Sequence, residues 1–402
     1  MGGSMSNTAS GRSRQAGRWL ALTGGAATGL AGAAAAATAL LPMPSLEWWA
    51  VGLLVLEFSL LVSAAGVLGL VLGLLGGRGA SGRGRRWTAT AVVAVNLALV
   101  VSGALPGLSA WSTARDLGAP LTLGGYLDGL SGEADRGPDA TVRYAEVDGE
   151  DLMLDVWRPT TEPAPDRPHP VVVNVHGGAE DAPQSPFPRW DVWLTELDHV
   201  VFDVDYRFFR DGDWRTPPGD LKCALGWIAA NAERYGADPD RITVMGQSAG
   251  GYLGLLASYT TTEELGPTCD APAEPAEVSA VIAWYAPGDA TAEISKHPRL
   301  GEDVWRQLSE ETWRLADEDW VPASPSSYLR PDLPPTLLIQ GGRDVLQRAE
   351  RTRAFADLLG EAGVDHTLVE IPYADHQFDL SWGGFGSQLA RHAISEFLTT
   401  HG

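Results

Sequence analysis

The chain has 402 residues, 45% of them hydrophobic and 20% charged, with 47 Gly, 27 Pro and 2 Cys. This length suits one large domain or two ordinary ones, and the composition excludes a disordered, a collagen-like or a disulfide-scaffold protein. The net charge of −22 is unevenly spread, because residues 1–117 carry eight arginines against three acidic residues, a balance of +5 that leaves −27 for residues 118–402. So acidic a body repels phosphate backbones, and we expect no nucleic-acid partner.

The amino-terminal part, residues 1–111, is predicted to be a membrane anchor. It contains three apolar stretches, at residues 19–41, 48–76 and 87–105, each near the roughly 20 residues that a helix needs to cross a bilayer. Three buried helices of a soluble domain are the alternative, but such helices have a polar face and these stretches have almost none. Glu57 lies inside the second stretch. If the membrane span starts just after Glu57, the carboxylate lies at the membrane interface, where a charge costs little free energy.

Positive charge flanks these stretches unevenly. Three arginines precede the first stretch and four lie between the second and the third, whereas residues 42–47 contain no Lys or Arg. The positive-inside rule therefore predicts a cytoplasmic amino terminus, and three crossings of the cell membrane place everything past residue 112 on the extracytoplasmic side. The first stretch could instead be a signal peptide, but the last two spans would keep the same orientation. Residues 112–140, rich in Gly, Pro and Asp, are predicted to be a linker.

Residues 141–402 are predicted to fold as an α/β domain. Two segments of alternating polarity indicate a strand pair with a turn at residues 148–149. Continuous apolar runs, typical of strands buried on both faces, follow at residues 171–175, 200–204, 242–245, 278–284, 336–339 and 367–371. Helical stretches lie between the runs, which predicts a mostly parallel twisted sheet with helices on both faces. In such sheets the reactive groups lie in loops at the carboxyl ends of the strands.

The sharpest motif is GQSAGG at residues 246–251, directly after one predicted strand and directly before a predicted helix. Ser248 would occupy a strained, sharp turn that projects its hydroxyl above the sheet. Glycines at 246 and 250 remove the Cβ atoms that would clash as strand and helix approach. An ordinary turn serine is the alternative, but the strand–turn–helix context favours a nucleophile.

A nucleophilic serine needs a base held by an acid, in the chain order Ser, acid, His. Asp344 and His376 both follow predicted strands, so we expect them at the sheet edge that carries Ser248. Asp344 could merely cap the following helix, and Asp375 is its rival as the orienting acid. A carboxylate one residue from His376 would rarely point at its ring, so the predicted catalytic residues are Ser248, Asp344 and His376.

A third strand end carries the segment His176-Gly177-Gly178-Ala179. Backbone N–H groups in such a Gly-rich segment can point at the oxygen that becomes negative in a tetrahedral intermediate. The N–H of Ala249, just after the nucleophile, would supply another donor. A plain β-turn at residues 177–178 is the alternative.

Residues 141–402 resemble the esterase/lipase group of α/β-hydrolases that includes the hormone-sensitive-lipase-like and feruloyl-esterase-like carboxylesterases. The resemblance is carried by VVFDVDYR, by the run from GDLKCALGW to GQSAGG, by SPSSYLRPDLPPTLLIQGGRD and by DHQFD, and it covers nearly the whole domain. It implies that Ser248 is the nucleophile, His376 the base and Asp344 its partner. It also implies that Gly178 and Ala179 lie in the oxyanion loop, which His176 and Gly177 support.

The sequence departs from this group at the same loops. The oxyanion loop reads HGGAED, where the group more often has a third Gly or an aromatic residue, and Gln377 stands where Gly usually follows the histidine. The acid loop reads GGRDVLQ, without the common Val-Pro after the aspartate. A three-helix anchor ahead of such a domain resembles membrane-tethered actinobacterial carboxylesterases.

Three further features complete the expectations. Cys223 and Cys269 fall on elements that should neighbour each other, so they form a disulfide on the extracytoplasmic side or remain two buried thiols. The insertion at residues 289–334 contains Trp305, Trp313 and Trp320, and either caps the acyl site or packs onto the domain body. The sequence shows no metal-ligand cluster and no phosphate-binding loop, so no metal or other cofactor is expected.

The sequence therefore predicts a membrane-anchored serine carboxylesterase that hydrolyses carboxylic esters through an acyl-enzyme. Its partners would be a small-molecule or lipid ester and the lipid bilayer. Two alternatives stay open: a serine peptidase of the same fold, and a non-catalytic binding module tethered to the membrane.

Overall fold

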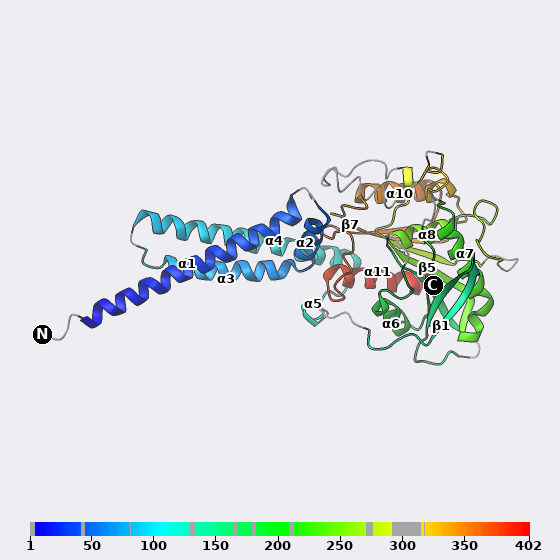
Figure 1. The fold of residues 1–402 in the computed structure, drawn as a ribbon, viewed down its shortest axis with the longest axis horizontal. Helices are drawn as coiled ribbons and strands as arrows, with labels where there is room; N and C mark the ends of the chain where they lie inside the picture. Colours follow the sequence, from blue (N-terminus) through cyan, green and yellow to red (C-terminus); the bar gives the residue numbers. More distant parts are fainter. Residues whose placement is uncertain are drawn as a thin grey trace. The chain divides into compact units, whose positions relative to one another are not determined.

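The computed structural model describes residues 5–41, 45–80, 82–128, 134–164, 167–178, 182–208, 213–270, 276–291, 315–316 and 318–402. The chain divides into two compact units, one built on Met1–Thr113 and the other on Ala114–Pro298 and Glu302–Gly402 (Figure 1). Each unit is described by itself.

The first unit consists of helices. They are α1 (Met5–Leu40), α2 (Leu46–Glu57), α3 (Ser59–Gly77) and α4 (Arg83–Leu117), whose last turn belongs to the second unit. The residues that α3 buries are small, Ser59 and four glycines, and a Cβ on Gly66 would lie 2.9 Å from the backbone nitrogen of Val100 in α4. Small residues let apolar helices pack closely where no hydrophobic effect drives them together. Buried Asn96 adds a polar link, because its Nδ2 donates to Gly25 O of α1 (2.9 Å).

Three of these helices are long and apolar enough to cross a membrane: Arg14–Ala39 within α1, then Ser59–Gly77 and Arg83–Leu117. The predicted stretches at 19–41 and 87–105 fall on the first and third of them. The second predicted stretch, 48–76, is not one helix, because the chain breaks at Phe58 and Glu57 is the last residue of α2. Glu57 therefore lies outside the apolar helix α3.

The second unit is built on an eight-stranded sheet in the order β1-β2-β4-β3-β5-β6-β7-β8. The strands are Ala140–Val147, Glu150–Trp157, His169–Val175, Val200–Val204, Ala237–Gln247, Ala280–Trp284, Thr336–Gly341 and His366–Ile371, numbered β1 to β8. The pairs β1–β2 and β2–β4 are antiparallel, and the other neighbours are parallel. The expected mostly parallel sheet is confirmed, with its carboxyl ends on one edge.

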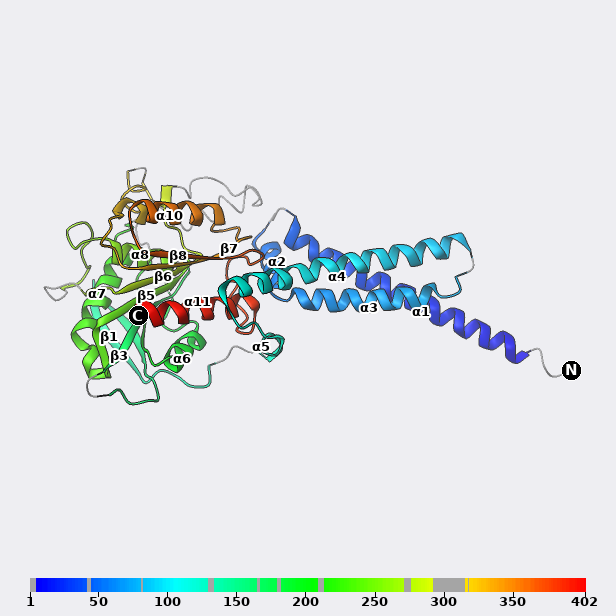
Figure 2. The same cartoon turned by 180° about the vertical axis from the view of Figure 1, so that it is seen from behind.

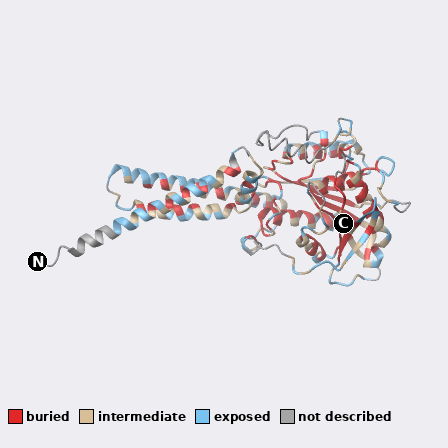
Figure 3. Ribbon diagram, viewed as in Figure 1, coloured by how far each residue is buried: buried red, intermediate tan, exposed pale blue. Residues whose placement is uncertain are grey.

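Helices cover both faces of this sheet (Figures 1 and 2). The helices α7 (Thr216–Asn231), α8 (Ala249–Tyr259) and α10 (Ala349–Glu361) bury apolar residues against one face. The helices α6 (Pro188–Glu196) and α11 (Phe385–His401) cover the other. Two short 3₁₀ helices occupy Ala232–Tyr235 and Pro325–Tyr328. The strands between these layers are the most buried part of the unit (Figure 3).

The segment predicted as a linker, residues 112–140, is more ordered than expected. Helix α4 continues to Leu117, a short helix α5 occupies Leu123–Asp128, and β1 begins at Ala140. Gln388 of α11 holds the start of α5, because its Oε1 accepts from Thr122 N (2.9 Å) and its Nε2 donates to Thr122 O (3.2 Å). Part of this segment is therefore packed onto the body of the second unit.

Candidate active site

Ser248 lies on the sharp turn between β5 and α8. Its φ of 52° and ψ of −118° are strained for a residue with a side chain. The turn also brings backbones into contact, since a Cβ on Gly250 would lie 2.0 Å from Val175 O of β3. The glycine requirement read from GQSAGG therefore has a steric cause, and the turn presents the serine hydroxyl at the carboxyl edge of the sheet.

The three predicted catalytic side chains meet at this edge. His376 follows β8, and its Nε2 lies 3.0 Å from Ser248 Oγ. Its Nδ1 lies 2.9 Å from Asp344 Oδ2, which follows β7. The other carboxylate oxygen of Asp344 accepts from the backbone N–H groups of Leu346 (2.9 Å) and Gln347 (2.8 Å). The carboxylate is thereby fixed in the orientation that faces the imidazole.

The charge of Asp344 acts on the imidazole. Burial lowers the pKa of His376, but the adjacent Asp344 carboxylate outweighs that effect, so the pKa is raised above its ordinary value. A raised pKa makes the ring a stronger base towards the serine proton.

Asp375, the rival acid, has a different role in the structure. Its Oδ1 accepts the backbone N–H of His376 (2.8 Å) and of Val345 (3.1 Å). Burial, followed by the nearby Asp344 charge, raises the pKa of Asp375 to about 6. Asp375 therefore ties the two loops together, and the contact with the imidazole ring is made by Asp344.

Sequence reasoning missed two residues beside the histidine. The ring centroid of Tyr285 lies 4.5 Å from that of His376, and the Tyr285 hydroxyl donates to Asp379 Oδ1 (2.7 Å). Tyr285 directly follows β6, as His376 and Asp344 follow their strands. A tyrosine at such a position was not considered as a site residue from the sequence. Gln377 adopts a φ of 58°, in the left-handed region that favours glycine, which explains why glycine is the usual residue at this position.

The expected oxyanion segment follows β3 directly. Its carbonyl at His176 accepts from the Tyr206 hydroxyl (2.8 Å), and the two rings stack with centroids 4.5 Å apart. Gly177 and Gly178 come next, and Ala179 lies outside the described residues. Ala249 is the first residue of α8, where helix N–H groups have no partner within the helix. The structure therefore places Gly177 and the amino terminus of α8 beside Ser248, since a Cβ on Gly177 would lie 3.2 Å from Ser248 Cβ.

A buried polar network lies behind this segment. Asn174 Nδ2 donates to Asp191 Oδ1 and to Asp203 Oδ2, each at 2.8 Å. Asp203 Oδ1 accepts the backbone N–H of Ser185 (2.7 Å), in the chain segment after the oxyanion loop. Burial raises the pKa of Asp191 to about 7 and also raises that of Asp203.

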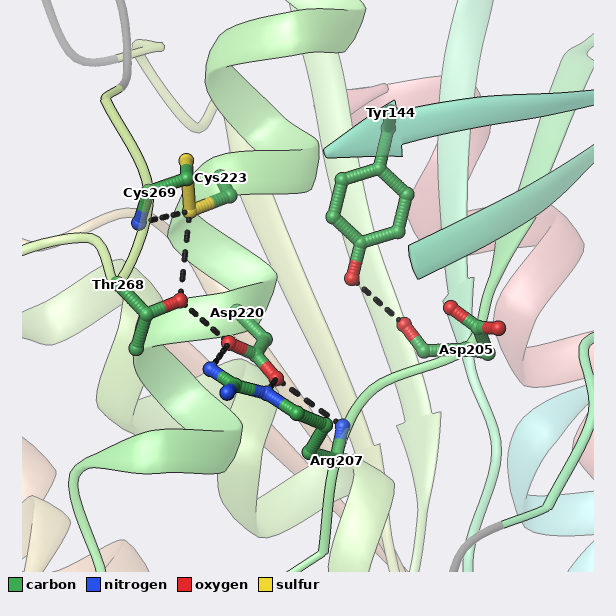
Figure 4. Close-up of a disulfide and its surroundings, with 7 residues drawn as sticks. All are labelled: Tyr144, Asp205, Arg207, Asp220, Cys223, Thr268 and Cys269. Atoms are coloured by element: carbon green, nitrogen blue, oxygen red, sulfur yellow. Dashed lines mark hydrogen bonds and ion pairs between the residues drawn. A yellow bond between two sulfur atoms is a disulfide. The ribbon is translucent and has the colours of Figure 1, made fainter. Parts of the chain in front are cut away.

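Cys223 of α7 and Cys269 are joined by a disulfide (Figure 4). The adjacent Thr268 hydroxyl donates to Asp220 Oδ1. Asp220 in turn accepts from Arg207, whose Nη2 lies 2.7 Å from Oδ1 and whose Nε lies 2.9 Å from Oδ2. Arg207 follows Tyr206, so this chain of contacts reaches the residue that holds the oxyanion segment.

The predicted insertion at 289–334 is only partly described. Trp305 and Trp313 lie outside the described residues, so the structure neither supports nor contradicts their proposed roles. Trp320 belongs to a turn at residues 318–323, and its carbonyl accepts from Ser324 Oγ (2.7 Å). Among the described residues there is no group of three His, Cys, Asp or Glu side chains that could hold a metal ion.

A mostly parallel sheet with a strained serine on the turn after β5, and a histidine and an aspartate after β8 and β7, defines an α/β-hydrolase. A family model, BD-FAE, matches residues 154–359, about half of the sequence. The chain belongs to the BD-FAE family, and its second unit is a carboxylesterase-type hydrolase.

Named relatives and solved structures agree with this class. Esterase LipQ of Mycobacterium tuberculosis is 31% identical over 263 residues, covering 62% of this chain and 59% of LipQ. The probable carboxylic ester hydrolase LipM of the same organism is 28% identical over 389 residues, covering 88% of this chain and 86% of LipM. The butyrate-bound structure of a thermophilic esterase from Thermogutta terrifontis is 25% identical with a TM-score of 0.53, over 65% of this chain and 93% of that chain. The chain thus spans well under two thirds of LipQ but most of LipM.

Proposed function

We propose that this chain is a membrane-anchored serine carboxylesterase whose catalytic residues are Ser248, His376 and Asp344. One observation carries the proposal: the continuous line of contacts from Ser248 Oγ to His376 Nε2 (3.0 Å) and from His376 Nδ1 to Asp344 Oδ2 (2.9 Å). The esterase names of the relatives and the butyrate bound to one structural neighbour support a carboxylic ester as the substrate.

The chemistry follows from this geometry. His376 Nε2 takes the Ser248 proton while Oγ bonds to the ester carbonyl carbon, and the carbonyl π electrons move to its oxygen. Backbone N–H groups of Gly178, Ala179 and Ala249 would donate to that oxyanion. The intermediate collapses, the alcohol leaves with the proton from His376, and an acyl-enzyme remains. Water, deprotonated by the same nitrogen, then releases the carboxylic acid and regenerates Ser248.

The membrane part of the proposal rests on the three apolar helices and on the arginines around them. A cytoplasmic amino terminus and a hydrolase unit on the extracytoplasmic side satisfy the positive-inside rule. The disulfide between Cys223 and Cys269 is compatible with an oxidising compartment.

Replacing the nucleophile tests the activity. Ser248→Ala in the full chain, purified in detergent, should lower kcat for p-nitrophenyl butyrate by a factor on the order of 10³ or more and abolish labelling by a fluorophosphonate probe. Ser258→Ala, on the helix that follows Ser248 but outside the contacts with His376, is the matched control and should retain both. Undiminished turnover by a folded Ser248→Ala protein would disprove the proposal, and a wild type that neither turns over nor reacts with the probe would favour a non-catalytic binding module.

A further inference from the structure

Exposed apolar side chains gather on one part of the second unit. Leu123 and Leu127 of α5, Phe187 before α6 and Leu380 after the histidine loop are 45–60% exposed. Among the described residues of this unit, the other large apolar side chains with comparable exposure are Val321 and Leu358. Leu358 lies on α10, which covers the opposite face of the sheet from α6 and α11.

The elements that carry these apolar side chains are bonded together. Gln388 joins the start of α5 to the loop before α11, since its Nε2 donates both to Thr122 O (3.2 Å) and to Gly383 O (2.8 Å). The ring of Tyr126 in α5 packs on Phe385 with centroids 4.8 Å apart. Both views show α5 beside the loop that leads into α11 (Figures 1 and 2). We call this surface, with its aromatic and arginine neighbours, the α5–α6–α11 patch.

The centre of the patch is a tryptophan between two arginines. The guanidinium carbon of Arg391 lies 4.0 Å from the Trp382 ring centroid, and that of Arg189 lies 4.6 Å from it. Trp193 packs against the same ring, with centroids 6.3 Å apart. The two positive charges are thus held close together, and burial followed by the repulsion from Arg189 lowers the pKa of Arg391 to about 10, which leaves it charged at neutral pH.

This pair is unusual in so acidic a unit. Residues 118–402 carry a net charge of −27, yet among the described residues one carboxylate lies within ion-pair distance of the two arginines, Glu196, 3.2 Å from Arg189. Each guanidinium group carries a planar fork of N–H donors that suits phosphate oxygens. Tryptophan, arginine and exposed leucines together are the side chains that favour the headgroup layer of a membrane.

The position of the patch along the chain indicates which partner meets it. Leu117 ends α4, a helix long and apolar enough to cross a membrane, and α11 holds that end through His392 Nε2, 3.1 Å from Leu117 O. Five residues lie between Leu117 and Leu123, so the patch begins within about 20 Å of the end of this helix. A bilayer that contained α4 would therefore be within reach of the patch.

We propose that the α5–α6–α11 patch contacts the bilayer surface, with Arg189 and Arg391 on lipid phosphates and the leucines in the interface, so that the site takes its ester substrate from the lipid. This inference rests on the proposed function. Its structural reason is that the loop carrying His376 continues into Leu380 and Trp382, and that Phe187 follows the oxyanion segment closely. Both sides of the catalytic edge are thereby connected to the patch.

Site-specific fluorescence quenching tests the contact. The two native cysteines are joined in the disulfide, so single variants Leu127→Cys, Leu380→Cys and the control Leu358→Cys can each carry one thiol-reactive fluorophore. The full chain is placed in nanodiscs with anionic phospholipid, with and without nitroxide-labelled lipid. Labels at 127 and 380 should be quenched several-fold more strongly than the label at 358. Equal quenching at all three positions, or none, would overturn the proposal.

Substrate choice separates this inference from the proposed function. The double variant Arg189→Gln/Arg391→Gln should leave hydrolysis of soluble p-nitrophenyl acetate unchanged. It should slow hydrolysis of a long-chain ester dissolved in anionic nanodiscs about tenfold or more, because each arginine near a charged surface contributes roughly 1 kcal/mol to membrane binding. Leu380→Ser is a second variant with the same expectation, and Arg353→Gln on α10 is the charge control. Equal rates for the wild type and both variants on the lipid ester would refute the proposed membrane contact of the patch. A wild type that is inactive on the soluble ester would instead refute the proposed esterase activity.

Discussion

Asp344 controls the base strength of His376 through its charge. Its carboxylate raises the pKa of the buried imidazole, and the rate of an esterase rises with pH as its base loses its proton. Asp344→Asn should therefore lower kcat on the order of 10⁴-fold. It should also move the ascending limb of the pH–kcat/KM profile to lower pH, because Asp344 is the largest of the charges that oppose the effect of burial on the pKa of His376. Profiles between about pH 5 and 9 for a soluble ester measure both effects.

Asp375 supplies the comparison for that experiment. Its Oδ1 accepts two backbone N–H groups, and an asparagine oxygen can accept the same bonds. Asp375→Asn should therefore keep most of the activity and shift the ascending limb less than Asp344→Asn does. If Asp375→Asn lost more activity than Asp344→Asn, Asp375 would be the acid that orients His376 and Asp344 would have the supporting role.

At this scale the sequence predicts residues that belong to a local pattern. Ser248 is recognisable because its turn needs glycines on either side, and His376 and Asp344 because each follows an apolar strand. Tyr285 also follows an apolar strand, but its partner Asp379 lies 94 residues away and only the folded sheet brings the two side chains together. The Asp191–Asp203 pair was missed for the same reason, because strand β4 and helix α6 meet there only through the fold.

The disulfide fixes the loop after α8 to helix α7. It closes a sequence separation of 46 residues, and a loop of that length restricts the unfolded chain by about 3–4 kcal/mol. The double variant Cys223→Ser/Cys269→Ser should lose stability of that order, seen as a lower Tm in detergent. Thr268→Ala, which keeps the disulfide but removes the hydrogen bond to Asp220, should lose less. A wild type whose Tm does not change on reduction would contradict this expectation.

Elements were predictable where composition alone determines them. Runs such as VVVNV and VVFDV can only be strands of a buried sheet, and they pair in register as neighbours β3 and β4. The break at Phe58 was not predictable by hydropathy, because apolar residues continue on both sides of it. Helix α5 was read as linker because LGGYLD has two glycines and little helix propensity. It is a helix here because Tyr126 and Thr122 find partners on α11.

At the scale of the whole molecule, the charge distribution predicts the orientation in the membrane. Arginines lie before the first apolar helix and between the second and the third, and the positive-inside rule predicts that these segments stay in the cytoplasm. Single cysteines at Glu146, exposed on β1, and at Ala80, between α3 and α4, report the two sides. In intact spheroplasts, a membrane-impermeant maleimide should label Glu146→Cys but label Ala80→Cys only after permeabilisation. Labelling in the reverse pattern would place the hydrolase unit in the cytoplasm, where the disulfide would also be hard to maintain.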